Sequence, residues 1–366
     1  MNRTVENRWY LLVALSSLLL AGLASAATVN VVGENDINVD RQNIQDAIDS
    51  APGEELRVML QGTFQLDGQR IFVTRSNLTI QGSEQGATLV GETDQDGIPA
   101  PGIGSGRAFE VRQQYADTPI TNLEFKGLEF RDVVRGINIG GFNLLGESAE
   151  VSNVVIKDNR MENVDLGIGG YGQVSHMVIK NNVIRDTLGA ALHLRSYTDE
   201  IGPDQKLSNV VVKDNFMSTA PSSNPFPLVF QGEGRNSDIE IKGNTFQGGI
   251  VAVALFGDPT NFIFKGNCIR DGGTQGLPGL RSGGIVVGLE LLGFTGSGYE
   301  IKNNSYANNV SDYGGIPLEQ RDVWLTPLSM NNAVIEQLGT VVLDDGVSNS
   351  VVLHGDDEDF CDGNDD

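Results

Sequence analysis

The 366-residue sequence is poor in aromatic residues and rich in glycine. Only 7% of its residues are aromatic, with 2 Trp, whereas 46 are glycine. Such a chain turns often and packs small side chains closely, which is typical of β-solenoids rather than of cores filled by large rings. At this length we expect one large elongated domain or two ordinary ones.

Basic residues are also scarce. The chain has 25 Lys and Arg against 48 Asp and Glu, a formal net charge of −23. Removing residues 1–26 would leave 25 − 2 = 23 basic and 47 acidic residues, a net charge of −24. This balance disfavours nucleic acid and anionic lipid as partners. It suits solubility in a salty medium or a site for divalent cations.

A long apolar run is missing from most of the chain, and the one present lies at its start. Arg3 and Arg8 precede the apolar run 9–23, which ends in Ala24-Ser25-Ala26. This order predicts a secretory signal peptide over residues 1–26, cleaved after Ala26. An uncleaved anchor is the alternative. No later segment is long enough to span a membrane, so we expect a secreted or periplasmic protein.

The chain has only two cysteines, Cys268 and Cys361. An even pair in an exported protein favours a disulfide, with two independent thiols as the alternative. No Cys/His cluster suggests zinc or copper, and no Gly-rich loop opening a helix suggests a nucleotide.

One short unit, [VIF]-K-x-N-x-[MIFY], repeats along the sequence. It occurs at residues 155–161, 178–184, 211–217, 240–246, 263–269 and 300–306, with a degenerate copy at 124–128. Successive lysines are 23 to 37 residues apart. A constant motif with variable spacing indicates a fixed coil with loops of different length. The β-branched, period-2 units predict an all-β fold: a right-handed parallel β-helix of about ten coils within residues 27–355.

The asparagine of each unit explains the repeat. Equivalent turns of a β-solenoid stack about 4.8 Å apart, so inward asparagines can hydrogen-bond to one another along the stack. Asparagine also tolerates the left-handed backbone of a tight turn. We expect this column at Asn159, Asn182, Asn215, Asn244, Asn267 and Asn304. Cys268 follows an inward asparagine and should point outward, where it could receive Cys361.

An amphipathic helix is expected around residues 41–52, ahead of the coils. Its apolar face would cover the end of the first coil, and Pro52-Gly53 would end it. The order I-Q-x-A-I-x-x-A-P-G, a strand ending in Gly-Thr-Phe, and then L-T-I-x-G resembles the N-terminal end of the pectate lyase/pectin lyase-like superfamily. That superfamily includes lyases, hydrolases, epimerases, methylesterases and non-enzymatic binding proteins. Residues 356–366 form an acidic tail after the coils.

The resemblance implies a substrate cleft on the second strand of each unit. On that strand Ile137, Ile168, Leu192 and Leu228 should point inward, leaving Asn138 and His193 outward, with Tyr171, Arg195 and Gln231 further along. We predict His193, Arg195 and Tyr171 as catalytic residues, and Asn138, Gln231 and Tyr197 as substrate contacts. Long loops over residues 91–107, 196–207, 218–226 and 270–283 could wall the cleft.

An arginine beside a histidine and a tyrosine suits β-elimination of a uronate. The cation neutralises the carboxylate, a base takes the C5 proton, and Tyr or His protonates the leaving oxygen. The calcium-binding aspartates of pectate lyases and the catalytic motifs of polygalacturonases and mannuronan epimerases are missing. We therefore predict a protein acting on an acidic polysaccharide, with lyase action favoured. The alternatives are a solvated His-Arg pair and a non-catalytic surface protein that binds glycan or protein.

Two further features bear on ligands. The motif lysines should form a basic column, and Lys157, Lys180 and Lys213 could hold an acidic glycan. A solvated strand edge that discourages aggregation is the blander interpretation. Asp94 and Asp96 stand in a D-x-D-G pattern that weakly indicates Ca²⁺ binding, and no other cofactor is indicated. We expect a monomer.

Overall fold

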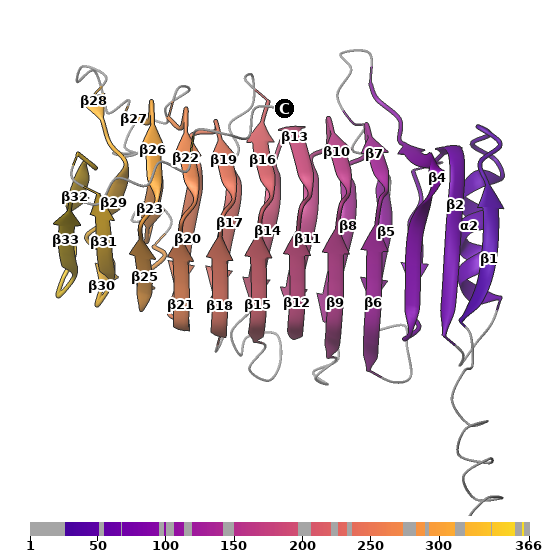
Figure 1. Ribbon diagram of the computed structural model, residues 1–366, viewed down its shortest axis with the longest axis horizontal. Coiled ribbons are helices and arrows are strands. Elements are labelled where there is room, and N and C mark those ends of the chain that lie inside the picture. The colour runs from indigo at the N-terminus through magenta and orange to yellow at the C-terminus, as the bar shows by residue number, and fades with distance from the viewer. Residues whose placement is uncertain are drawn as a thin grey trace, which may run out of the picture.

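The computed structural model describes residues 26–50, 55–66, 68–94, 99, 106–112, 119–141, 150–196, 206–220, 226–232, 236–273, 283–289, 293–311, 319–337, 339–355 and 361. These residues form a right-handed parallel β-helix with an N-terminal capping helix, as the repeat predicts (Figure 1). The predicted signal peptide, residues 1–26, lies outside the described residues except for Ala26. The described part contains no helix long and apolar enough to cross a membrane.

Three parallel sheets run the length of the stack. Sheet 1 consists of β1 (Ala27–Val32), β2 (Leu56–Gln65), β4 (Leu78–Val90), β6 (Ile120–Lys126), β9 (Val151–Lys157), β12 (Val174–Lys180), β15 (Leu207–Lys213), β18 (Ser237–Lys242), β21 (Thr260–Lys265), β25 (Tyr299–Lys302), β31 (Ala333–Gln337) and β33 (Ser350–His354). Sheet 2 continues from the ends of β2 and β4 through β7 (Glu129–Arg131), β10 (Arg160–Glu162), β13 (Val183–Thr187), β16 (Phe216–Thr219), β19 (Thr245–Gln247), β22 (Cys268–Arg270) and β26 (Ser305–Ala307).

Sheet 3 positions the candidate site. Its main path is β3 (Ile71–Val73), β5 (Arg107–Arg112), β8 (Arg135–Gly141), β11 (Leu166–Gly172), β14 (Ala190–Ser196), β17 (Phe226–Gly232), β20 (Val253–Gly257), β23 (Ile285–Val287), β29 (Val323–Leu325) and β32 (Val342–Asp344). Two short strands, β24 (Gly296–Ser297) and β30 (Ser329–Met330), pair beside it. The antiparallel pair β27 (Val310–Ser311) and β28 (Glu319–Gln320) stands apart.

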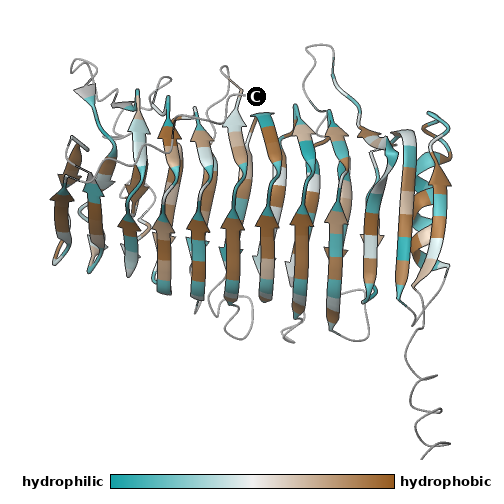
Figure 2. Ribbon diagram, viewed as in Figure 1, coloured by the Kyte–Doolittle hydropathy of each residue, from teal (hydrophilic) through white to brown (hydrophobic). Residues whose placement is uncertain are grey.

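The core fills the space between the three sheets. Alternate residues of each strand point inward, and Ile137, Ile168, Leu192 and Leu228 of sheet 3 are all fully buried, as predicted. Brown segments accordingly recur at the same height in successive coils (Figure 2). Because every coil presents the same inward face to the next, burial is continuous along the stack.

Helix α2 (Asp40–Asp49) covers the first coil, close to the predicted range of residues 41–52. Ile44 and Ile48 are fully buried against the core. The side chain of Gln45 also donates to the Phe72 carbonyl at 3.1 Å and accepts from the Phe72 amide at 2.8 Å. The helix therefore covers apolar side chains and also satisfies backbone groups at the first edge of sheet 3.

The asparagine column forms as predicted. Each side-chain amide donates to the carbonyl oxygen of the next, at 3.0 Å from Asn159 to Asn182 and 2.9 Å from Asn182 to Asn215. Each backbone amide donates to the same oxygen, as Asn182 N does to Asn215 Oδ1 at 2.9 Å. We call Asn159, Asn182, Asn215, Asn244, Asn267 and Asn304 the asparagine ladder.

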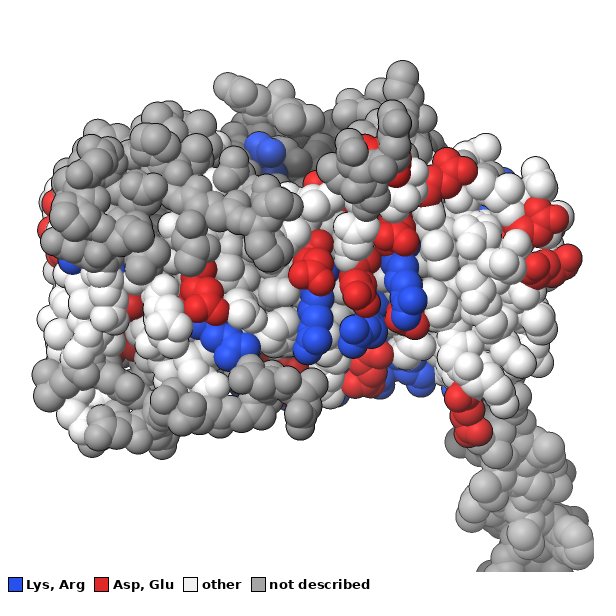
Figure 3. Space-filling model, turned by 90° about the horizontal axis from the view of Figure 1, so that it is seen from above, with Lys and Arg blue, Asp and Glu red and all other residues white. Residues whose placement is uncertain are grey.

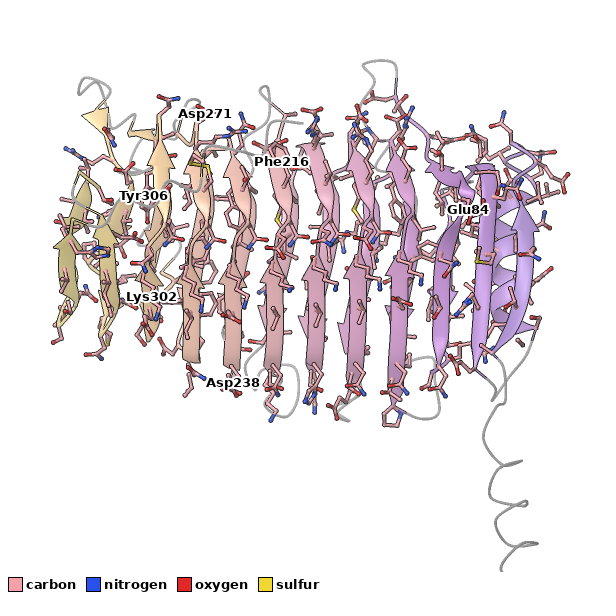
Figure 4. The ribbon with its side chains drawn as sticks, in the orientation of Figure 1. Glu84, Phe216, Asp238, Asp271, Lys302 and Tyr306 are labelled. Carbon is pink, nitrogen blue, oxygen red and sulfur yellow. A yellow bond between two sulfur atoms is a disulfide. The ribbon has the colours of Figure 1, made fainter. Side chains whose placement is uncertain are left out.

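A carboxylate ends the ladder. Glu336 accepts from the Asn304 backbone amide and from its side-chain amide, both at 2.7 Å, and from the Tyr306 hydroxyl at 2.9 Å. Tyr306 is labelled in Figure 4. Burial raises the pKa of Glu336 to about 7, although these donors favour the charged form.

The prediction that the ladder asparagines take the left-handed conformation is wrong. The residue before each ladder asparagine has the positive φ instead, for example Asp158 at 55°, Asn181 at 55° and Gly243 at 63°. The turn thus assigns its two tasks to different residues. The left-handed residue turns the chain from sheet 1 into sheet 2. The asparagine that follows it can then direct its amide along the stack.

Cys268 and Cys361 form a disulfide, with Cα atoms 4.9 Å apart. Cys268 lies on β22 in register with Thr245 and Ser305, on the side opposite the inward Ile269. It is 1% exposed. In Figure 4 the yellow sulfur–sulfur bond lies close to the labelled Asp271. The predicted outward placement is confirmed.

Candidate functional site

The outward face of sheet 3 brings the predicted catalytic residues together. Gly169 of β11 pairs in register with His193 of β14, and Tyr171 pairs with Arg195. Arg195 in turn pairs with Gln231 of β17. Their inward neighbours are core residues, so period-2 alternation places the five residues on one face. The predicted column is therefore present on three adjacent strands.

Tyr171 and His193 are in direct contact. The Tyr171 hydroxyl oxygen lies 3.4 Å from His193 Nδ1, and the two rings meet edge to face with centroids 5.3 Å apart. Burial, then the charges of Arg195 and Arg135, lower the pKa of His193 to about 4. His193 is therefore neutral at pH 7. Its Nε2 atom is buried and meets no described atom at full hydrogen-bond geometry, although an interaction with the Gln231 side chain partly opposes the fall in its pKa.

A glycine makes this contact possible. A Cβ atom on Gly169 would lie 2.4 Å from Tyr171 Cε2 and 2.6 Å from Asn138 Oδ1. Both side chains consequently occupy the space that a larger residue would need. Asn138 is 6% exposed, and its Oδ1 atom accepts no hydrogen bond from any described residue. Asn138 Oδ1 and His193 Nε2 lie on the same face of sheet 3, on β8 and β14 with β11 between them. Other buried polar atoms of the described chain, such as Gln81 Oε1 and Thr219 Oγ1, are also without a hydrogen-bond partner.

Tyr171 and His193 line a pocket of about 430 Å³ over the middle coils. Gln231 contributes from the next coil, as predicted, whereas Arg195 lies beside the pocket and is not among its lining residues. The complete lining is Arg135, Asp165, Leu166, Tyr171, Leu188, Gly189, Ala190, His193, Phe226, Val229, Gln231, Phe256, Leu289 and Phe294. This volume suits one or two sugar rings more than an extended polymer.

One side of the pocket is charged. Arg135, at the start of β8, and Asp165, just before β11, both line it. Burial raises the pKa of the Asp165 carboxyl, and the charge of Arg135 opposes that rise. Arg107 pairs in register with Arg135 and forms an ion pair with the buried Glu110 at 3.1 Å.

Cations outnumber carboxylates around this charged side. Arg70 contacts the same Glu110 at 2.9 Å, so one buried carboxylate serves two guanidinium groups. Burial and the proximity of Arg135 lower the pKa of Arg107. Arg70, Arg107 and Glu110 are not among the residues that line the pocket, so the lining itself presents one guanidinium, Arg135, and one carboxyl, Asp165.

The opposite side of the pocket is apolar, which the repeat motif does not predict. Phe256 and Phe294 stack with centroids 5.4 Å apart at an interplanar angle of 27°. Leu289 pairs with Phe294 through two backbone hydrogen bonds of 2.8 and 3.0 Å, which turns both side chains over sheet 3. These residues lie outside the repeat motif, so only the apolar composition around residues 285–294 could have drawn attention to them.

The predicted lysines lie elsewhere. Lys157, Lys180 and Lys213 end β9, β12 and β15 of sheet 1 and stack in register, so the predicted basic column exists. The structure does not bring them to the pocket. Glu124 contacts Lys157 at 2.7 Å and Lys126 at 3.5 Å, and Glu240 likewise bridges Lys242 and Lys265. Much of the column's charge is thus compensated.

Sheet 2 shows the same mixing of charge. On the face seen from above in Figure 3, blue and red side chains lie next to each other. Ion pairs there join Arg131 to Glu129 at 2.6 Å and Arg160 to Glu162 at 3.3 Å. The described residues of this face therefore form no continuous track of one sign for a polyanion.

The remaining predicted site residues lie outside the described residues or away from the pocket. Tyr197 and Asp96 lie outside the described residues, as do most residues of the four loops expected to wall the cleft. Asp94 is described and exposed after β4. Within the described ranges, no three His, Cys, Asp or Glu side chains gather as a metal site would require. Calcium binding stays a prediction.

No protein-family model matches this chain, and no curated protein matches it in sequence. Solved structures do match it in fold. The surface adhesin PfbA of Streptococcus pneumoniae aligns with a TM-score of 0.55 at 15% identity, over 90% of this chain and 91% of the adhesin. An alginate lyase from Paenibacillus sp. str. FPU-7 aligns with a TM-score of 0.53 at 12% identity, over 89% and 99%.

A further match is ORF18 of Geobacillus virus E2, with a TM-score of 0.56 at 15% identity. It covers 94% of this chain, which spans 64% of the viral protein. An enzyme and an adhesin thus share this architecture equally well. At such low identity the likeness extends to the parallel β-helix and leaves activity to the site itself.

Proposed function

We propose that this protein is an exported, carbohydrate-active member of the pectate lyase/pectin lyase-like superfamily that cleaves an acidic polysaccharide by β-elimination. The observation that carries the proposal is the Tyr171–His193 pair, which lines a pocket together with Arg135. The disulfide supports export, because such bonds persist in oxidising compartments.

The two ring groups can divide the proton transfers. If His193 Nδ1 carries the proton and donates it to the Tyr171 hydroxyl oxygen, Nε2 holds a free lone pair. Nε2 then takes the C5 proton of a uronate as the C4–O bond breaks and a C4–C5 double bond forms. The Tyr171 hydroxyl gives its proton to the departing oxygen. The arrangement of a neutral base beside an acid thus fits the reaction.

The arginines can lower the barrier to this proton loss. A uronate carboxylate next to C5 becomes enolate-like as the proton leaves, and a nearby guanidinium stabilises that charge. Arg135 lines the pocket and Arg195 lies next to His193 in the same strand. A bound carboxylate would also offset the two charges that depress the pKa of His193, making it a stronger base.

The apolar side gives the sugar a surface to rest on. Phe256 and Phe294 present ring faces and edges, and the carbon-bound hydrogens of a pyranose pack well against aromatic rings. Gln231, whose amide side chain lines the pocket, can hydrogen-bond to a sugar hydroxyl. Charged, apolar and hydrogen-bonding elements thus surround a single pocket.

The decisive experiment incubates the protein with a panel of uronic-acid polysaccharides, with and without Ca²⁺, and follows the ultraviolet absorbance of unsaturated chain ends. We expect absorbance to grow with at least one polymer. Tyr171→Phe and His193→Gln should each lower the rate about 100-fold or more. Lys180→Ala, on the other face, should leave it unchanged. No signal across the panel would overturn the lyase proposal, and binding without turnover would favour the non-catalytic alternative.

A further inference from the structure

The two ends of the stack are built differently. At the first end, α2 places Ile44 and Ile48 over the core and Gln45 on the edge of sheet 3. At the other end, β33 is the last strand of sheet 1, and β31 is its only strand partner in the described chain. Figure 1 shows α2 and β33 at opposite ends of the molecule. Within the described residues, one end is capped and the other, which we call the open end, is not.

Exposed apolar side chains concentrate at the open end. Among the described residues, five of the six large hydrophobic residues that are exposed belong to the last coils: Met330 at 43%, Val347 at 62%, Val351 at 39%, Val352 at 51% and Leu353 at 40%. Val351 pairs in register with the fully buried Val334. It is exposed because no described coil follows to cover it. Figure 2 shows β33 brown along most of its length.

Strand β33 lacks the lysine that ends most earlier strands of sheet 1. A lysine ends each strand of sheet 1 from β6 to β25, and these lysines stack in register. Lys302 pairs with Ile335, which pairs with Val352. Edge strands that must stay single are commonly protected by lysine. The lysine is absent from β33, the strand where it would best prevent pairing with another chain. Ser350–His354 carries no Lys, Arg, Asp or Glu at all.

We propose that two copies of this chain associate end to end through the last coil. The β33 strands run antiparallel across a two-fold axis, so each edge pairs with an identical one. A head-to-tail filament is disfavoured because α2 covers the apolar core at the opposite end. This dimer replaces the expectation of a monomer drawn from the sequence.

The structure favours a second copy over the chain's own continuation. Cys361 is bonded to Cys268 on β22, in the coil of β21, and the coils of β25 and β31 separate that coil from β33. The disulfide therefore holds residue 361 away from the open end. Ser350–His354 itself carries no acidic side chain, so pairing two copies of this strand places no like charges directly opposite each other.

Val352 gives a direct test, because it is the central residue of Ser350–His354. In an antiparallel two-fold pair it faces Val352 of the other copy, where two like charges would be opposed. Val352→Lys restores the lysine of the earlier strands, so the fold tolerates it. Val32→Lys is the matched control, since Val32 is 59% exposed at the capped end.

The experiment measures the mass of the chain from residue 27 onward by light scattering and sedimentation equilibrium over a range of concentrations. We expect a dimer for the wild type and for Val32→Lys. For Val352→Lys the dissociation constant of the dimer should rise about tenfold or more, which shifts this variant toward monomer. Thermal unfolding of Val352→Lys checks that it is folded. A wild type that is monomeric throughout, or a dimer that Val352→Lys leaves intact, would overturn the proposal.

Discussion

The asparagine ladder and the outward column of sheet 3 are both stacks of side chains repeated coil after coil. In the ladder every rung is the same, and Asn182 uses its amide and carbonyl groups fully. In the sheet 3 column every rung differs, and no described residue meets the buried Asn138 Oδ1 and His193 Nε2 atoms at hydrogen-bond geometry. A column of identical, fully hydrogen-bonded side chains stabilises a solenoid. A column of different side chains, some with unpartnered polar atoms, can instead bind a ligand.

Breaking the middle of the ladder should have the largest effect. Asn215 accepts from the Asn182 backbone and side-chain amides and donates to Asn244. Asn215→Ala leaves these buried groups unpaired, so we expect a loss of about 4 kcal/mol in the free energy of unfolding. Urea denaturation measures it, with Lys180→Ala as the control. A loss under about 1 kcal/mol would contradict the structural role of the ladder.

The end of the ladder should make stability depend on pH. The pKa of Glu336 is raised to about 7, so its contribution is full below about 4.5 and is lost as the pH rises through 7. Glu336→Gln mimics the neutral form. Relative to the wild type, this variant should therefore gain up to about 3 kcal/mol between pH 5 and pH 8.

Melting temperatures of both proteins across that range provide the test of Glu336. Asp322, whose pKa burial also raises, remains in both proteins and so cancels in the comparison. Parallel curves for the wild type and Glu336→Gln would show that Glu336 does not titrate as inferred.

Compared with a substitution in the asparagine ladder, one in the sheet 3 column should lower stability less and activity more. Gly169→Ala forces a Cβ atom against Tyr171 and Asn138, which we expect to cost about 2 kcal/mol. Gly140→Ala is the control, because its Cβ atom would meet only the Val111 carbonyl oxygen, at 3.4 Å. Lyase or glycan-binding assays should show a loss for the first variant alone. Equal activity of both variants would remove Tyr171 from the site.

The smallest effect on stability is expected at Asn138, which contrasts most directly with the ladder asparagines. Asn138→Leu removes an acceptor that already lacks a partner, so stability should change by less than about 1 kcal/mol, while binding of a sugar weakens. The same change at Asn182 should cost about 4 kcal/mol. Thermal unfolding and calorimetric titration with the identified glycan separate the two effects. Equal destabilisation would mean that Asn138 is structural after all.

The repeat was the strongest part of the sequence-based prediction. Its asparagines, its lysines and the cap around Ile44 lie where the motif and the helical periodicity place them, since each is a local pattern imposed by stacking. The left-handed position was assigned one residue too late. The motif does not reveal which of two adjacent polar residues turns the chain, since Asn, Asp and Gly all suit that conformation.

The site was only half predictable. Alternation along β14 suffices to turn His193 outward, and strand stacking brings Tyr171 beside it. Arg135, Asp165 and Phe294 reach the pocket from strand ends and connecting segments, whose paths no repeat encodes. The lysines predicted as substrate contacts do not line the pocket. Their positive charge suits an acidic ligand, but it does not reveal on which of the three faces they lie.

By itself, then, the sequence determined the coil, the polar column within it and the covalent link between Cys268 and Cys361. The tertiary structure alone decided that His193 would be neutral, that no described atom would meet its Nε2 atom at hydrogen-bond geometry, and that no described coil would follow β33. The first group depends on contacts that recur with the motif, which composition and spacing record. The second depends on burial by residues distant in sequence, and burial is a property of the assembled stack.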